Sequence, residues 1–202
     1  MKKENLFCAT SNNKLWMREA SLQDIKWLNI GHANKVVGMT SSSGKLFCAT
    51  KDNKLWMREP VLHDVAWHHI GHANKVVSMA AIGDSLFCAT SDNKLWMRES
   101  VLHDVKWHHI GHANKVVGMT AVDGMLFCAT KDNKLWVRES ALHNIKWLHI
   151  GHANKVVGMT SVDGKLFCST KDNKLWVREP VLHDVSWHHI GHANKVVAMA
   201  ST

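Results

Sequence analysis

The sequence has no apolar stretch long enough to cross a membrane. Its 202 residues include only 2 prolines and no tyrosine, and no apolar run approaches the ~18–20 residues of a membrane span. The first residues, Met1–Asn5, lead directly into repeated sequence, without the apolar region of a signal peptide. Hydrophobic residues make up 46% of the chain and charged residues 21%, which excludes wholesale disorder. We therefore expect a globular protein without membrane insertion.

The cysteines do not form a disulfide framework. There are 5 of them, an odd number that cannot all pair within one chain. Each lies in the same Leu-Phe-Cys-(Ala/Ser)-Thr string of a repeat, and equivalent positions of a repeat lie farther apart than the ~7 Å between Cα atoms that a disulfide allows. Free buried thiols are typical of a reducing compartment, so we expect a cytoplasmic protein. The cysteines are Cys8, Cys48, Cys88, Cys128 and Cys168.

The positive charge is scattered rather than gathered in one patch. The formal net charge is +8. Lysines recur once per copy in Asn-Lys-Leu-Trp and once in Asn-Lys-Val-Val, with acidic residues between them. A basic stripe that could follow a phosphate backbone is therefore missing, and we expect no nucleic-acid partner.

The chain is built from five tandem copies of one forty-residue unit. The string Gly-His-Ala-Asn-Lys-Val-Val recurs without insertion or deletion, and we treat residues 1–202 as a single domain. Its copies begin at Gly31, Gly71, Gly111, Gly151 and Gly191.

Each unit contains four short apolar runs, which predict four antiparallel strands. In the second unit they are Lys35–Thr40, Leu46–Thr50, Leu55–Arg58 and Trp67–Ile70. The runs are rich in strand-forming residues and are bounded by turn residues such as Asp-Gly and Asp-Asn, while helical periodicity is missing. The predicted fold class is all-β.

Both faces of the second predicted strand are apolar. In Leu46-Phe47-Cys48-Ala49, Leu and Cys point one way, while Phe and Ala point the other. Sheets covered on both sides, repeated with a period near 40 residues, predict radial stacking in a β-propeller. The position nearest the axis carries only small residues, as a narrow five-bladed ring requires: Gly38, Ser78, Gly118, Gly158 and Ala198.

The ends of the chain predict how the ring closes. The sequence opens at a second strand, Leu6–Cys8, and stops after a first strand, Lys195–Thr202. We therefore expect the C-terminal strand to pair with the N-terminal blade.

One face of the predicted propeller gathers groups that suit a sugar. Since successive strands reverse direction, the second and fourth connections share this face, which presents carboxylate, amide and imidazole groups from every unit. Such groups orient sugar hydroxyls, and a nearby Trp offers a plane for the apolar face of the sugar ring. The candidate binding residues are Asp52, Asn53, His72, Asn74, Asp92, Asn93, His112, Asn114, Asp132, Asn133, His152, Asn154, Asp172, Asn173, His192, Asn194, His32 and Asn34. The candidate stacking residues are Trp27, Trp67, Trp107, Trp147 and Trp187.

Structural roles for these residues stay open at this point. Asp and Asn form turns without any ligand, His72 can bond Asp52 or Asp92 to hold the loops, and both Trp sets can pack between blades. The opposite face carries the longest connection, Arg58–Val65, which is the alternative binding surface.

Sixteen histidines raise the question of a metal, but we expect no metal and no other cofactor. His63, His68, His69 and His72 cluster in sequence, yet the adjacent strand residues His68 and His69 point to opposite faces. Only the Gly-His position keeps histidine in every unit. The Ser, His and Asp residues recur from unit to unit, and no unit carries a nucleophile elbow or phosphate loop out of this pattern, so we expect no enzyme.

The repeat resembles the tectonin and tachylectin group of propeller lectins. The resemblance rests on Trp67-x-x-Ile70-Gly71 before a Val-Val strand, then Gly-Lys-Leu-Phe, then Asn-Lys-Leu-Trp-x-Arg, and it extends from Leu6 to Ala200. A V-W-G-V-N-type second strand of that group is replaced here by Leu-Phe-Cys-Ala-Thr. The resemblance implies binding of glycans or glycoconjugates at several equivalent sites, without catalysis. We expect the protein to act as a monomer.

A second resemblance is to WD repeats. Gly71-His72, a strand, a hairpin and then Asp92-Asn93-Lys94-Leu95-Trp96 follow their layout, although Met97 stands where the Asp of Trp-Asp would be. In WD repeats the Gly-His histidine and the Asp of the following tight turn share a structural hydrogen-bond network. This resemblance implies a protein-interaction scaffold. The near-identity of the units also fits recent duplication or an engineered symmetric propeller.

Overall fold

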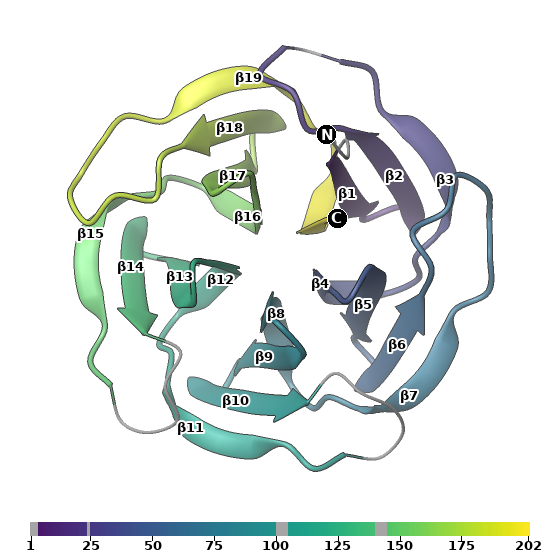
Figure 1. Ribbon diagram of the computed structural model, residues 1–202, viewed down its shortest axis with the longest axis horizontal. Helices are drawn as coiled ribbons and strands as arrows, with labels where there is room; N and C mark the ends of the chain where they lie inside the picture. The colour runs from purple at the N-terminus through teal and green to yellow at the C-terminus, as the bar shows by residue number, and fades with distance from the viewer. Residues whose placement is uncertain (1–3, 24, 100–104, 140–144) are drawn as a thin grey trace.

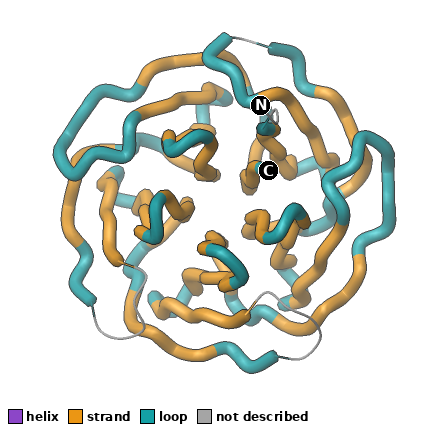
Figure 2. Tube along the Cα trace, in the orientation of Figure 1, coloured by secondary structure: helices purple, strands orange, loops and turns teal. Residues whose placement is uncertain are grey.

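The protein is a five-bladed β-propeller. The computed structural model describes residues 4–23, 25–99, 105–139 and 145–202. Within these ranges, twenty strands form five antiparallel sheets of four strands, arranged radially around one axis (Figure 1). The described residues form strands and connections without a helix (Figure 2), and so contain no helix that could span a membrane. The predicted fold class is confirmed.

Each blade runs from an innermost strand at the axis to an outermost strand at the rim. We number the blades by their sheets: blade 1 is β20-β1-β2-β3, blade 2 is β4 to β7, blade 3 is β8 to β11, blade 4 is β12 to β15 and blade 5 is β16 to β19. The innermost strands are β4 (Val36–Ser42), β8 (Val76–Ile82), β12 (Val116–Val122), β16 (Val156–Val162) and β20 (Val196–Ser201). The second strands are β1 (Asn5–Thr10), β5 (Lys45–Thr50), β9 (Ser85–Thr90), β13 (Met125–Thr130) and β17 (Lys165–Thr170). The third strands are β2 (Lys14–Glu19), β6 (Lys54–Arg58), β10 (Lys94–Glu99), β14 (Lys134–Glu139) and β18 (Lys174–Arg178). The outermost strands are β3 (Leu28–His32), β7 (His68–His72), β11 (His108–His112), β15 (Leu148–His152) and β19 (His188–His192).

The hydrophobic core lies in the interfaces between blades. Leu46 and Cys48 of blade 2 pack in one cluster with Phe7 and Ala9 of blade 1, and four further clusters fill the other interfaces. Burying a Leu or Phe side chain contributes about 1.5–3 kcal/mol. Strands that are apolar on both faces are therefore required, as the sequence predicts.

The tight turns form where residues tolerate positive φ. Asp123 and Gly124 join β12 to β13 with φ of 48° and 76°, the pattern of a type I′ hairpin turn. Asn53 has a φ of 63° in the second connection of blade 2. The predicted hairpins are confirmed at these positions.

The outermost strand differs from the prediction because it contains a β-bulge. β7 covers His68–His72 rather than Trp67–Ile70. Leu55 pairs with Gly71 and the next residue, Trp56, pairs with His69, which leaves Ile70 as the extra residue. Gly71 adopts a φ of 135° at this bend, and the register shifts at the equivalent place in every blade. Gly71 and His72 thus belong to the strand, not to the fourth connection.

Ring closure follows the prediction. β20 pairs antiparallel with β1, and Leu6 lies opposite Ser201. Asn5, the first residue of β1, and Thr202, which follows β20, exchange backbone hydrogen bonds of 2.8 and 3.0 Å. β1 and β20 lie side by side in the ring (Figure 1), so blade 1 is assembled from segments near both ends of the chain.

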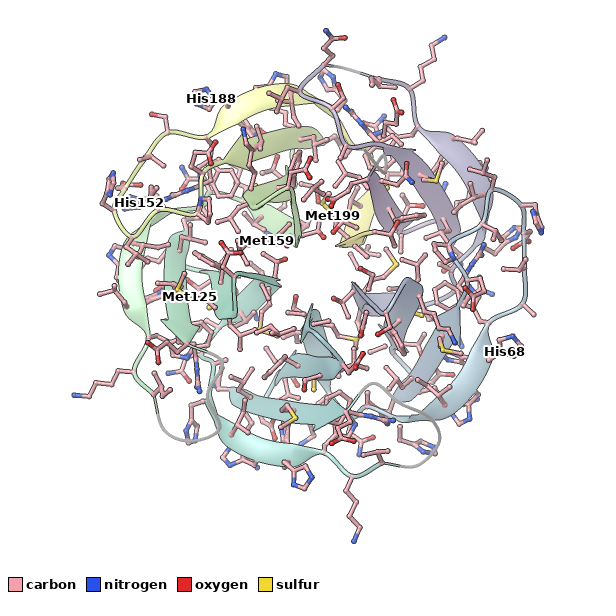
Figure 3. All side chains as sticks on the ribbon, in the orientation of Figure 1. His68, Met125, His152, Met159, His188 and Met199 are labelled. Atoms are coloured by element: carbon pink, nitrogen blue, oxygen red, sulfur yellow. The ribbon has the colours of Figure 1, made fainter. Side chains whose placement is uncertain are left out.

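The small residues of the innermost strands lie where neighbouring blades meet. A Cβ added to Gly38 would stand 3.0 Å from the Cγ of Met79 on β8, and one added to Gly118 would stand 3.0 Å from the Cγ of Met159 on β16. At these two positions an added Cβ would therefore have to displace the neighbouring methionine slightly. Met159 and Met199 lie near the centre of the ring (Figure 3).

The five thiols are free and buried, and we expect them to be unreactive in the native protein. Burial raises the pKa of each thiol, including Cys8 and Cys88, far above its usual range, so the reactive thiolate is scarce at neutral pH. A chromogenic thiol reagent should modify no cysteine in native protein and all of them in denaturant. Fast modification of the native protein would contradict this burial.

Candidate functional site

Equivalent pockets lie between neighbouring blades of the described structure. One occupies each of the five interfaces, with volumes from about 300 to about 460 Å³, the size of a small-ligand site. The fourth connection of one blade forms one wall. The second connection, second strand and two tryptophans of the next blade form the other. We call these the interblade pockets.

The interblade pockets bring together three of the predicted sets. In the pocket between blades 1 and 2, Asn34 faces the same space as Asp52 and Trp67. The asparagines of the fourth connection line all five pockets: Asn34, Asn74, Asn114, Asn154 and Asn194. The second connection contributes Asp52, Asp92, Asp132 and Asp172, with Asn12 at the equivalent place in blade 1. The stacking candidates Trp27, Trp67, Trp107, Trp147 and Trp187 line one pocket each.

The asparagines of the second connection have a structural role instead. The Oδ1 of Asn53 accepts a hydrogen bond of 3.0 Å from the backbone N–H of Lys75, and its carbonyl accepts one of 2.9 Å from Ala73. Asn53 therefore ties the second connection to the fourth connection of the same blade. Asn53, Asn93, Asn133 and Asn173 are not among the residues that line the pockets.

The aspartates are held as ionised acceptors. The Thr90 hydroxyl donates a hydrogen bond of 2.6 Å to Oδ1 of Asp92, and this bond holds the pKa of Asp92 below its usual range, with smaller contributions from Lys75 and Lys94. Lys75 Nζ lies 3.7 Å from Oδ2 of Asp92. The same hydroxyl contact lowers the pKa of Asp52, Asp132 and Asp172. A fixed, exposed carboxylate is thus available to accept hydrogen bonds from a ligand at neutral pH.

The tryptophans that precede the outermost strands are fixed across the blade interface. The indole Nε1 of Trp67 donates a hydrogen bond of 2.8 Å to the carbonyl of His32 in blade 1. The guanidinium of Arg58 lies 5.5 Å from the centre of its ring, within cation–π range. The other four indoles donate equivalent bonds of 2.8 Å. These rings both join the blades and present a fixed surface to the pockets.

Two of the Gly-His histidines, His32 and His152, contact aspartates that do not belong to the tight turns. Nδ1 of His32 lies 3.1 Å from Oδ2 of Asp64, and Nδ1 of His152 lies 3.0 Å from Oδ2 of Asp184. Both aspartates belong to the third connection of the following blade, not to a tight turn. The histidine contact lowers the pKa of each aspartate. The corresponding third-connection positions 24, 104 and 144 lie outside the described residues. His72, His112 and His192 also line pockets, whereas His32 and His152 do not.

The third connection, the alternative binding surface, is organised around a buried arginine. The Arg58 side chain is fully buried and donates hydrogen bonds of 3.1 and 3.2 Å to the carbonyls of Glu59 and His63. Desolvation by burial lowers the pKa of Arg58. Leu62 at the tip of the connection is 62% exposed. Arg58 is thus committed to holding the loop and is not a solvated surface charge.

Four positions outside the predicted binding residues line all five pockets. In the pocket between blades 1 and 2 they are Lys35, Cys48, Thr50 and Trp56, and Ala33 lines this pocket as well. Each recurs once per unit, so repetition alone could have marked them. However, Lys35 is the turn residue before a strand, and Cys48 and Trp56 fit a strand interior. Their convergence depends on the packing of one blade against the next.

The pockets combine hydrogen-bonding and aromatic side chains. Within the described residues, no group of three or more His, Cys, Asp or Glu side chains is arranged to hold a metal ion. Each pocket combines hydrogen-bonding groups with indole surface, which is the arrangement that orients a polar ligand with one apolar face.

Comparison with known proteins adds a likeness in fold. No family model and no curated protein matches the sequence. A chain from the nidogen/laminin complex superposes with a TM-score of 0.65 at 11% identity, covering 98% of both chains. The glutaminyl cyclase of Myxococcus xanthus superposes with a TM-score of 0.59 at 11% identity, covering 96% of this chain and 73% of that one. At such identities the likeness shows the propeller fold alone.

Proposed function

We propose that this protein is a multivalent, non-catalytic lectin of the tectonin/tachylectin type, which binds one sugar unit in each interblade pocket. The proposal rests on one observation: every pocket contains an exposed asparagine, a hydroxyl-bound carboxylate or amide, and two tryptophans. The equivalence of the five pockets then makes the binding multivalent.

The polar wall suits the hydroxyl groups of a sugar. Asp92 accepts hydrogen bonds, and the Asn74 amide both donates and accepts them, from opposite sides of one pocket. Asp92 is already oriented by Thr90, so little conformational entropy is lost on binding. In blade 1, Asn12 takes the place of the carboxylate and accepts the same bond, of 2.6 Å, from Thr10.

The indoles suit the apolar face of a sugar ring. Trp96 and Trp107 line the same pocket, and the Trp107 orientation is set by its bond to the carbonyl of His72. An aromatic plane next to fixed hydrogen-bonding groups recognises a ligand that is polar at its edges and apolar on one face.

The biological strength of such binding comes from multivalency. A single shallow site of this kind binds weakly, at about 4 kcal/mol for a millimolar dissociation constant. When a surface displays many glycans, sites on one ring bind together and raise the overall affinity by ~10²–10⁴ if the geometry permits. A glycan-coated surface is therefore the partner that a ring of equal sites fits.

A glycan array followed by calorimetry tests the proposal. We expect selective binding on the array, and saturable binding of the preferred monosaccharide at close to five sites per chain. The equal sites predict one class of affinity, with blade 1 as the exception because it carries Asn12 instead of an aspartate. If the protein bound no glycan on a broad array, the lectin proposal would be contradicted and a protein-interaction scaffold would be favoured.

A further inference from the structure

Paired histidine rings lie on the outermost strands at the rim of the propeller. In blade 2 the ring centres of His69 and His72 are 5.4 Å apart, with their planes at 84°. Equivalent pairs occur in three other blades: His109–His112 at 5.5 Å, His149–His152 at 5.9 Å and His189–His192 at 5.4 Å. Figure 3 shows His152 at the outer rim of the ring.

The β-bulge creates these pairs. In a regular strand, residues three apart point to opposite faces of the sheet. Here His72 pairs with Lys54 and His69 pairs with Trp56, because Ile70 is the extra residue. Lys54 and Trp56 are two residues apart and share a face, so His69 and His72 share it too. The sequence-based expectation of no metal site considered the adjacent residues His68 and His69, which cannot share an ion.

The spacing of the rings matches two imidazoles on one metal ion. An imidazole nitrogen binds Zn²⁺ at about 2.0 Å and the ring centre lies about 1 Å behind it, so two rings on one tetrahedral ion have centres about 5 Å apart. All four histidine pairs have centre-to-centre distances close to this value. All eight rings are also exposed to solvent, so an ion can reach them without a change of fold.

A carboxylate orients one of these rings from the neighbouring blade. Oδ2 of Asp184 lies 3.0 Å from Nδ1 of His152, which leaves Nε2 as the nitrogen available for an ion. Carboxylate support of this kind fixes the ring and strengthens a ligating histidine. Lys134 pairs across the strands with His152, but its ammonium lies over the Trp136 ring, 5.8 Å from the ring centre.

We propose that each histidine pair binds one divalent transition-metal ion through two imidazole nitrogens, with water completing the coordination. Imidazole favours Cu²⁺, Zn²⁺ and Ni²⁺ over Mg²⁺ and Ca²⁺, and affinity rises toward Cu²⁺. His72, His112 and His192 also line interblade pockets, whereas the first histidine of each pair does not. Metal binding is therefore measured without sugar.

Blade 1 is an internal control, since Asn29 replaces the first histidine of the pair. The proposal therefore predicts four ions per chain and not five. Binding through the position of His68 would predict three, because blades 1 and 4 carry Leu28 and Leu148 there.

Calorimetry of tag-free protein with Zn²⁺ alone tests this count. We expect close to four sites in the native protein and loss of binding when His69, His109, His149 and His189 are all changed to Asn, the residue that blade 1 tolerates. Two control variants should each retain four sites. One changes His63, His103, His143 and His183 to Gln, as in blade 1, and the other changes His68, His108 and His188 to Leu.

Tryptophan fluorescence provides a second measurement. His69 lies edge-on to Trp56 with ring centres 5.1 Å apart, so bound Cu²⁺ should quench that indole and its equivalents in the other paired blades. Quenching should vanish in the His→Asn variant while its melting temperature stays unchanged. Zinc binding that survives the four His→Asn changes, or its absence from the native protein, would overturn the proposal.

Discussion

Deletion of residues 196–202 should leave the chain without a folded ring at room temperature. β20 supplies the innermost strand of blade 1 and pairs along its length with β1. Val196 and Met199 are buried within it, and each such side chain contributes about 1.5–3 kcal/mol. Each lost ladder hydrogen bond adds about 0.5–1.5 kcal/mol. The total is comparable with the ~5–15 kcal/mol by which a typical domain is stable.

Circular dichroism and thermal denaturation measure this effect. Trimming residues 1–3, which lie outside the described residues, is the matched control and should change the melting temperature little. Equal melting temperatures for the two truncations would contradict closure by the C-terminal strand.

A circular permutation tests whether the ring needs this strand itself or needs it at the C-terminus of the chain. Residues 196–202 can be moved in front of Asn5, with a two-residue Asp-Gly turn in place of residues 1–4, like the Asp123-Gly124 turn between β12 and β13. The backbone bonds between Asn5 and Thr202 place these ends at hairpin distance. The permuted chain should recover a cooperative transition near that of the native protein, since it retains every strand.

Replacing the five pocket asparagines with alanine should abolish multivalent glycan binding while leaving the fold intact. Asn34 and its equivalents are exposed, and surface substitutions of this kind usually change stability by less than about 0.5 kcal/mol. Each lost hydrogen bond costs about 0.5–1.5 kcal/mol of binding, or up to roughly tenfold at one site. Because the sites act together on a glycan surface, the losses multiply.

Surface plasmon resonance on an immobilised glycan measures the multivalent affinity. Calorimetry with the free sugar measures the affinity of a single site. The set comprises Asn34, Asn74, Asn114, Asn154 and Asn194. The matched control changes His68, His108 and His188 to Leu, which alters exposed residues outside the pockets. Full binding by the asparagine set would move the sugar site to the third connection, at His63 and Asp64.

The pairing of polar groups in the pocket could be predicted only in part. Strand direction alone places Asn34 and Asp52 on one face, and the structure brings them to one pocket. The roles of Asn53 and Asp52 could not be separated in advance, because both residues are turn formers. Their difference arises from the backbone: Asn53 at positive φ directs its side chain to the N–H of Lys75, while Asp52 stays at the pocket wall.

The sequence by itself determined the fold and its closure. A forty-residue period, strands apolar on both faces and an offset between the repeat and the termini admit few arrangements besides a five-bladed ring. The tertiary structure alone decided which side chains meet. Asp64 of blade 2 reaches His32 of the neighbouring blade 1, and His69 meets His72 through a bulge that the residue pattern does not predict. The physical reason is that periodicity reports which face a residue occupies, whereas contacts between blades depend on register and on chain segments thirty or more residues apart.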